Sequence, residues 1–246
     1  MADPDALPES VSQLLHELGA IFGARLQSVS IYGANGEAEA LTGGGAGEAH
    51  DHIHTLAVAA SIGADDLRAC ARLSASWNRK RLAVPLLLTT AELSRSLDAF
   101  PLELGEILAH HRVVFGADVL AGLSVAPADA RRACETQVRS HLLHLREGYI
   151  QAGAQPRALA SIIQASARPF RLLLASVARL EGADMKDAAA LARHLEQRVG
   201  VAPGVAQQVL AAERSKSFGA TEAQDVYPAY VRAVEQLAQY IDAWQA

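Results

Sequence analysis

The sequence predicts an α+β protein in which a small mixed sheet with flanking helices precedes an all-α helical bundle. Two observations support this prediction. Segments before residue 125 alternate apolar and polar side chains with the period of a strand, and no segment after that point does so. After Pro127 the apolar residues recur at three- and four-residue spacing, which is typical of packed helices. We therefore expect two domains, residues 1–122 and residues 123–246.

The first half begins with an amphipathic helix that is expected to end at Gly23. Residues 26–32 then alternate apolar and polar side chains, which indicates a half-buried strand, and residues 53–60 are expected to form a second strand. Between them, the glycine-rich residues 33–47 favour neither helix nor strand. A helix is expected over residues 65–77.

The third expected strand is the continuous apolar run at residues 82–88, which we interpret as buried on both faces of the sheet. Pro85 lies inside this run, and a proline removes one donor from a strand ladder. The sequence Thr89-Thr-Ala-Glu92 is a capping box, in which the first side chain and the last exchange hydrogen bonds with each other's backbone amides. It therefore marks the end of the strand and the start of a helix.

Helical patterns continue through the second half. Helices are expected over residues 128–152, from Pro156, after a cap at Asp184, from Pro203 and from Thr221. The connections between them are short, which favours a bundle of neighbouring helices. The second and last of these helices carry broad apolar stripes, and we expect the bundle to mediate association with a second copy or with a partner protein.

Composition excludes several classes of function. The net charge is -5 and the pI is about 6.0, so a strong non-specific attraction to nucleic acid is not expected. No apolar run approaches the ~20 residues that span a bilayer, and the first basic residue is Arg25, so neither a membrane span nor a charged leader is expected. Cys70 and Cys134 do not make a disulfide framework, which indicates a cytoplasmic protein.

Several short motifs follow one another along the chain. They are the strand from Arg25 to Gly33, the run from Val84 to Leu93, the phrase Phe100-Pro-Leu-Glu-Leu104, the segment His111-Arg-Val-Val-Phe-Gly116 and the helical stretch from Leu142 to Tyr149. In this order they resemble the nucleotidyltransferase superfamily that includes kanamycin nucleotidyltransferase and DNA polymerase β. The resemblance extends to a bacterial subgroup with a C-terminal helical domain.

The resemblance implies a nucleotide-binding site at Gly33 and Ala34, where the superfamily carries a Gly-Ser pair. On the next strand the superfamily carries an Asp-x-Asp pair, whose carboxylates share one face and hold two Mg²⁺ ions beside a nucleoside triphosphate. In this sequence Ala34 replaces the serine, and His52 and His54 occupy the positions of the two aspartates. The third strand also offers no carboxylate. The residues therefore predict a catalytically degenerate protein that acts by binding a nucleotide or a partner.

Neutral imidazoles favour zinc or another transition metal over Mg²⁺. If a divalent metal binds, we expect His52 and His54 to hold it, with Asp51 as a further candidate ligand. An alternative is an active nucleotidyltransferase, moving a nucleoside monophosphate from a triphosphate to a hydroxyl acceptor, with magnesium ligands relocated to Asp51 or Glu48.

A second alternative concerns the bundle. Arg139 and His144 have the Arg-x4-His spacing of helical ribonuclease domains, where an arginine and a histidine act on a phosphodiester as charge stabiliser and acid or base. Against this, we expect His141 and His144 to lie on a partly solvated side of their helix. Cys134 on the same helix is interpreted as a small core residue.

Overall fold

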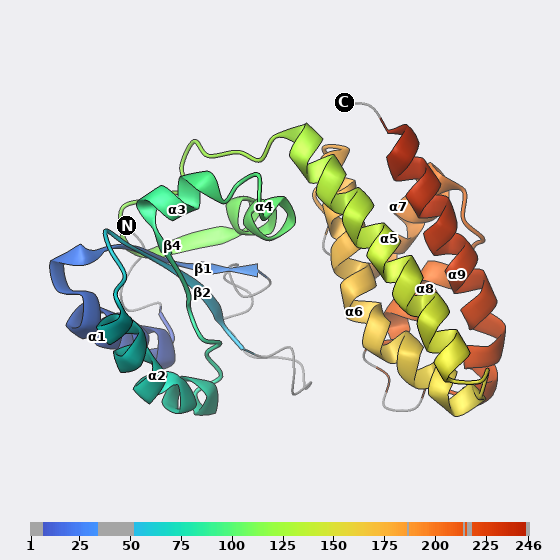
Figure 1. Cartoon of the computed structure of the whole chain (residues 1–246), viewed down its shortest axis with the longest axis horizontal. Coiled ribbons are helices and arrows are strands. Elements are labelled where there is room, and N and C mark those ends of the chain that lie inside the picture. Colours follow the sequence, from blue (N-terminus) through green and yellow to red (C-terminus); the bar gives the residue numbers. More distant parts are fainter. Residues whose placement is uncertain (1–6, 34–51, 186, 214, 216–217, 245–246) are drawn as a thin grey trace. The chain divides into compact units, whose positions relative to one another are not determined.

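The computed structural model describes residues 7–33, 52–185, 187–213, 215 and 218–244. The chain divides into two compact units, unit 1 (Met1–Val125) and unit 2 (Ala126–Ala246) (Figure 1). Unit 1 contains a sheet with flanking helices, and in the described part of unit 2 every regular element is a helix. The predicted α+β class is therefore confirmed.

The sheet of unit 1 contains the strands β1 (Leu26–Tyr32), β2 (His54–Ala59), β3 (Leu86–Thr89) and β4 (His111–Gly116). Their order across the sheet is β3-β2-β1-β4 (Figure 1). β1 pairs antiparallel with both β2 and β4, whereas β2 and β3 run parallel. The sheet is thus mixed, and β1 and β2 are its central strands.

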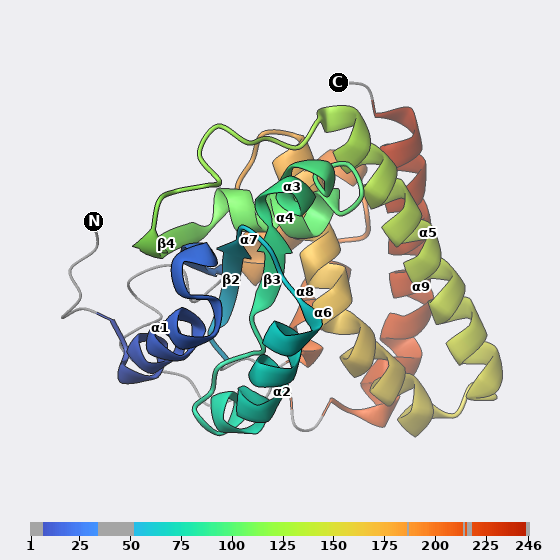
Figure 2. The same cartoon turned by 60° about the vertical axis from the view of Figure 1, so that its left-hand side comes forward.

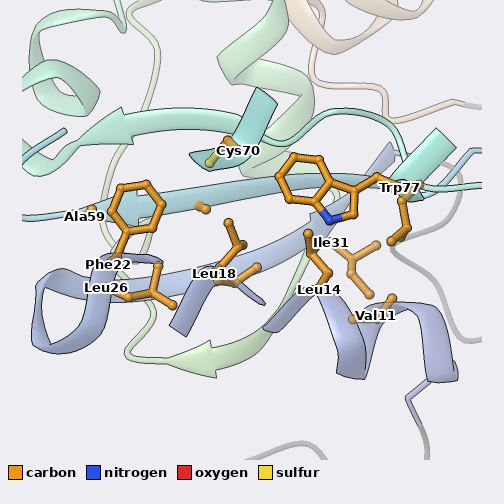
Figure 3. Packing of buried hydrophobic residues seen from close by; sticks show 12 residues of the cluster. Val11, Leu14, Leu18, Phe22, Leu26, Ile31, Ala59, Cys70 and Trp77 are labelled. Atoms are coloured by element: carbon orange, nitrogen blue, oxygen red, sulfur yellow. The ribbon is translucent and has the colours of Figure 1, made fainter. Parts of the chain in front are cut away.

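Helices cover both faces of this sheet. On one face, α1 (Glu9–Phe22) and α2 (Ala64–Arg79) pack against the strands, with a short 3-10 turn, η2 (Gly23–Arg25), leading from α1 into β1. Figure 3 shows the apolar side chains that fill this side, including Leu14, Leu18 and Trp77. The other face carries α3 (Thr90–Arg95) and α4 (Pro101–Ala109) (Figure 2). Their Leu93, Leu104 and Ile107 pack with Leu56 and Val58 of β2.

Because helices cover both faces of the sheet, β1 is buried on both sides, and its interpretation as a half-buried strand is wrong. Ser28 and Ser30 alternate with apolar residues, yet they are only 1% and 2% exposed. They point to the side of α3 and α4, because Val29 and Ile31 belong to the cluster under α1 and α2. A serine is small enough to lie beneath packed helices, so here the alternation marks two different buried faces.

The prediction for residues 82–88 is wrong in both extent and burial. The strand comprises only Leu86–Thr89 and lies at the edge of the sheet, where Val84 and Leu86 are 64% and 38% exposed. Pro85 immediately precedes the strand, a position where proline is tolerated because no ladder hydrogen bond needs its missing amide proton. The capping box is confirmed: the Glu92 amide donates to Thr89 Oγ1 at 3.2 Å, and the Thr89 amide donates to the Glu92 carboxylate at 2.8 Å.

One ion pair joins the start of β1 to the start of α2. The Arg25 guanidinium donates to both carboxylate oxygens of Asp66, at 2.7 and 2.8 Å, and also to the carbonyl oxygens of Ile21 and Ser61. Asp66 additionally accepts a hydrogen bond from the Gly63 amide at 2.8 Å. These donors hold the pKa of Asp66 down, at about 2. The two-point contact fixes the first turn of α2 against the sheet.

Unit 2 consists of α5 (Pro127–Gln151), α6 (Pro156–Leu180), α7 (Ala188–Val199), α8 (Val205–Ala212) and α9 (Ala220–Ala243). The three long helices α5, α6 and α9 pack against one another in all three pairs, and α8 packs between α6, α7 and α9. None of the helices in the described ranges has the length and apolar character that crossing a bilayer requires.

Two expectations for unit 2 need correction. The cap of α7 is Asp187, whose carboxylate accepts from the Ala190 amide at 2.7 Å, and not Asp184. His141 is only 7% exposed, because the neighbouring helices α6 and α9 cover the side of α5 that carries it. His144, three residues on, lies on the exposed side as expected.

The Arg25–Asp66 pair should contribute to the stability of unit 1. We expect Asp66→Asn to lower the urea midpoint at neutral pH, whereas Asp65→Asn, at an exposed position of the same helical turn, should change it little. Because the folded pKa of Asp66 lies below its ordinary value of 3.8, its stabilisation is present above pH 3.8 and disappears as the pH falls towards 2. Fluorescence of the buried Trp77 reports the transition. Equal midpoints for the two variants at neutral pH would contradict this role.

Candidate functional site

Three polar aromatic side chains form a row across the sheet, where β1 ends and β2 and β4 begin. The strand register pairs Tyr32 with His54 on one side and with His111 on the other. Directly paired residues of antiparallel strands point to the same face, so the three rings lie side by side. We call His54, Tyr32 and His111 the Tyr32 row. Tyr32 packs against the cluster beneath α3 and α4, which places the row on that face of the sheet.

The two predicted metal-binding histidines contact different neighbours. The ring of His54 lies against that of Tyr32, with centroids 5.7 Å apart and planes tilted by 40°. His52 precedes the first residue of β2, and its Nε2 lies 2.8 Å from the side-chain oxygen of Asn78, near the end of α2. The strand alternation that was expected to aim both imidazoles at one ion therefore begins only at His54.

His111 and Asp118 form a contact that sequence reasoning missed. The Nε2 of His111 lies 3.3 Å from an Asp118 carboxylate oxygen, and its Nδ1 lies 3.1 and 3.2 Å from the carbonyl oxygens of Ile107 and Leu108. A neutral imidazole carries one N–H and donates to one of these sides at a time. Asp118 also accepts from the Leu120 amide at 3.0 Å, so the carboxylate is held in place.

Gly33, the residue after β1, lies in the left-handed region, at a φ of 79°. A Cβ at this position would meet no atom within 4 Å, so the backbone conformation, and not a lack of space, favours glycine here. Its amide donates to the His110 carbonyl oxygen at 3.1 Å, which ties the end of β1 to the start of β4. Ala34, Glu48 and Asp51, the other residues predicted to act at this site, lie outside the described residues.

The side chains at this end of the sheet fit Mg²⁺ poorly. β1, β2 and β3 contain no acidic residue. Across the part of the chain that the structure describes, no group of three or more histidine, cysteine, aspartate or glutamate side chains is arranged to hold a metal. Burial raises the pKa of Tyr32, so its phenol stays neutral at physiological pH. The side chains of the Tyr32 row thus offer rings for stacking, and the carboxylate in contact with the row, Asp118, is held by His111 and the Leu120 amide.

Arg139 and His144, the predicted ribonuclease pair, have different surroundings on α5. The Arg139 guanidinium donates to both carboxylate oxygens of Asp242 on α9, at 2.9 and 2.7 Å, and to Glu135 at 3.2 Å. His144 is exposed, with its Nδ1 3.5 Å from a carboxylate oxygen of Glu147. The arginine therefore takes part in the packing of α5 on α9.

Comparison with solved structures identifies the fold. The chain is similar to the crystal structure of spectinomycin adenyltransferase AAD(9) from Enterococcus faecialis with ATP and spectinomycin, with a TM-score of 0.55 and 11% sequence identity. The match covers 95% of this chain and 98% of that one. No family model and no curated protein sequence matches the chain. At this identity the similarity establishes the fold alone, which is that of a nucleotidyltransferase.

Proposed function

We propose that the protein binds a nucleotide at the Tyr32 row and does not catalyse nucleotidyl transfer. The observation that carries the proposal is that histidines stand at positions 52 and 54, where the resemblance implies aspartates. The three side chains of the row are a phenol and two imidazoles, no acidic residue lies on β1, β2 or β3, and Asp118 contacts the row from outside the sheet. The similar fold of AAD(9), crystallised with ATP, supports a nucleotide as the ligand.

The chemistry of the row favours binding over catalysis. Aromatic rings stack on a nucleobase, and neutral N–H and O–H groups donate to phosphate oxygens. Nucleotidyl transfer needs more, because two Mg²⁺ ions must be held by oxygen ligands at the reacting phosphate. Losing one transition-state contact commonly lowers a rate by ~10²–10³, and the residues that replace these ligands coordinate Mg²⁺ weakly.

Titration calorimetry with ATP tests both halves of this proposal. We expect ATP to bind and Tyr32→Ala or His54→Ala to weaken it by about tenfold or more, the equivalent of losing one stacked ring. His16→Ala, which removes an exposed histidine of α1, serves as the control and should bind as the unaltered protein does. We expect no release of pyrophosphate in the presence of Mg²⁺.

Two results would contradict the proposal. Absence of ATP binding by the unaltered protein would remove the nucleotide site. Robust Mg²⁺-dependent release of pyrophosphate that Asp51→Asn or Glu48→Gln abolishes would instead support an active nucleotidyltransferase with relocated ligands.

We further propose that any metal bound by the protein is a transition metal, held by His52 and His54. The two imidazoles are two residues apart, and neutral imidazole nitrogen is a good zinc ligand. We expect the double change His52→Ala/His54→Ala to abolish zinc binding in calorimetry and to leave the fold intact, since both side chains are only partly buried. Unchanged zinc affinity in the double variant would place any zinc site elsewhere, for example at His110 and His111.

Association through the bundle is proposed for the exposed side of α5. The apolar stripes of α6 and α9, which first indicated association, are mostly buried within unit 2. Leu143 and Ile150 of α5 are 57% and 77% exposed, and their spacing of seven residues puts them on one side of the helix. We expect a homodimer through this side.

Sedimentation at micromolar concentration should therefore give twice the chain mass of 26.0 kDa. The double change Leu143→Glu/Ile150→Glu should return the protein to a monomer. Leu172→Glu, at an exposed leucine of α6, is the matched control. A monomer of the unaltered protein under these conditions would remove the idea of a dimer.

A further inference from the structure

A buried polar network joins the three long helices of unit 2. The Nε2 of His141 on α5 lies 2.5 Å from the hydroxyl oxygen of Tyr230 on α9, and that hydroxyl donates to Ser166 Oγ on α6 at 3.3 Å. Ser166 in turn donates to the carbonyl oxygen of Ile163 at 3.0 Å. We call His141, Tyr230 and Ser166 the His141 network.

The number of protons in this network assigns the state of the imidazole. A hydroxyl has one proton to donate, and the proton of Ser166 is used on the Ile163 carbonyl. Tyr230 therefore donates its own proton to Ser166 and accepts from the imidazole. The neutral ring of His141 must then carry its proton on Nε2. With this arrangement each hydrogen bond of the network has one donor and one acceptor.

Aromatic packing surrounds the same ring. His141 stacks on Phe170 of α6 with centroids 5.6 Å apart, and Tyr230 meets Phe170 edge-on at 5.0 Å. Burial, and to a smaller extent the nearby His144 on the same helix, lower the pKa of His141 to about 4. On α9, the titratable group in contact with His141 or its network is Tyr230. On α6, the residues of this enclosure are Phe170 and Ser166, whose side chains do not titrate. Among the described residues, no carboxylate is in contact with His141 to stabilise a cation.

We propose that His141 is an acid-sensitive contact of unit 2, which holds α5, α6 and α9 together while its ring is neutral and loosens them when the ring is protonated. A second proton would create a cation in an aromatic enclosure that provides no compensating charge. Protonation of His141 therefore shifts the equilibrium from the packed bundle towards an opened one. The bundle needs the neutral ring, and the cation is favoured in an opened or unfolded unit 2, where water reaches it.

The direction of the pH effect follows from linkage. In the unfolded chain the imidazole takes up a proton near its ordinary pKa of 6.5, whereas in the bundle it does so only near 4. The stabilising effect is therefore complete above pH 6.5 and is lost as the pH falls from there towards 4. For these two values the opening equilibrium constant rises roughly thirtyfold between about pH 7.5 and about pH 5.

Hydrogen exchange measured by mass spectrometry on the full chain tests this proposal, because it reports each helix separately. After correction for intrinsic exchange, protection of peptides from α5, α6 and α9 should fall roughly thirtyfold between about pH 7.5 and about pH 5. His141→Phe keeps a ring in the aromatic enclosure and should lose this extra pH dependence. His144→Gln, which removes the exposed histidine of the same helix, should retain it.

Direct titration of the histidine ring signals by NMR covers the case in which His141→Phe does not fold. At about pH 5.5 we expect His141 to remain neutral and protonated on Nε2, since its ring is buried and its pKa in the bundle is about 4. A His141 ring that is already cationic at about pH 5.5 would overturn the proposal. So would the same loss of protection on acidification in the His141→Phe variant as in the unaltered protein.

Discussion

The antiparallel pairing of β1 with both of its neighbours is the constraint on which the candidate site depends. Because β1 is central, a single register brings Tyr32 between His54 and His111. A slip of one residue would exchange the two faces of the strand, moving Val29 and Ile31 out of the cluster beneath α1 and α2. Both faces are covered by helices, so the register is specified from two sides. At the far end, Gly116 permits a close approach, since a Cβ there would lie 2.0 Å from the Gln27 carbonyl oxygen.

The fold and the chemistry of its site are separate properties of this protein. The four-stranded sheet with its flanking helices, followed along the chain by a helical unit, is the fold of a nucleotidyltransferase. At positions 52 and 54, where that resemblance implies carboxylates, the side chains are imidazoles. The geometry of such a fold comes from strand pairing and core packing. The side chains of the site can therefore differ while the fold stays the same.

The two units use buried polar groups in different ways. In unit 1 Asp66 is anionic and fully matched by Arg25 and the Gly63 amide. In unit 2 the carboxylate of Glu181, at the end of α6, is contacted by His194, Arg198 and Tyr240, which connects α6 with α7 and α9. His141 lies among the same helices but is surrounded by aromatic rings and a hydroxyl. Asp66 and Glu181 can be buried as anions because cationic side chains lie against them. Among the residues that the structure describes, His141 has no charged partner of this kind, so its ring fits the core only when it is neutral.

The sequence by itself determined the types of elements and several of their ends. Helical spacing after Pro127, the end of the first helix at Gly23 and the capping box at Thr89 are local properties, and the structure agrees with each. Only the tertiary structure decided which positions are buried and which residues meet. Ser28 and Ser30 are buried, and β3 lies at an exposed edge, because strand order and helix cover arise from long-range pairing. The contacts of His111 with Asp118 and of His141 with Tyr230 have the same origin. Periodicity records the polarity of neighbours along the chain, whereas these contacts join residues that packing brings together.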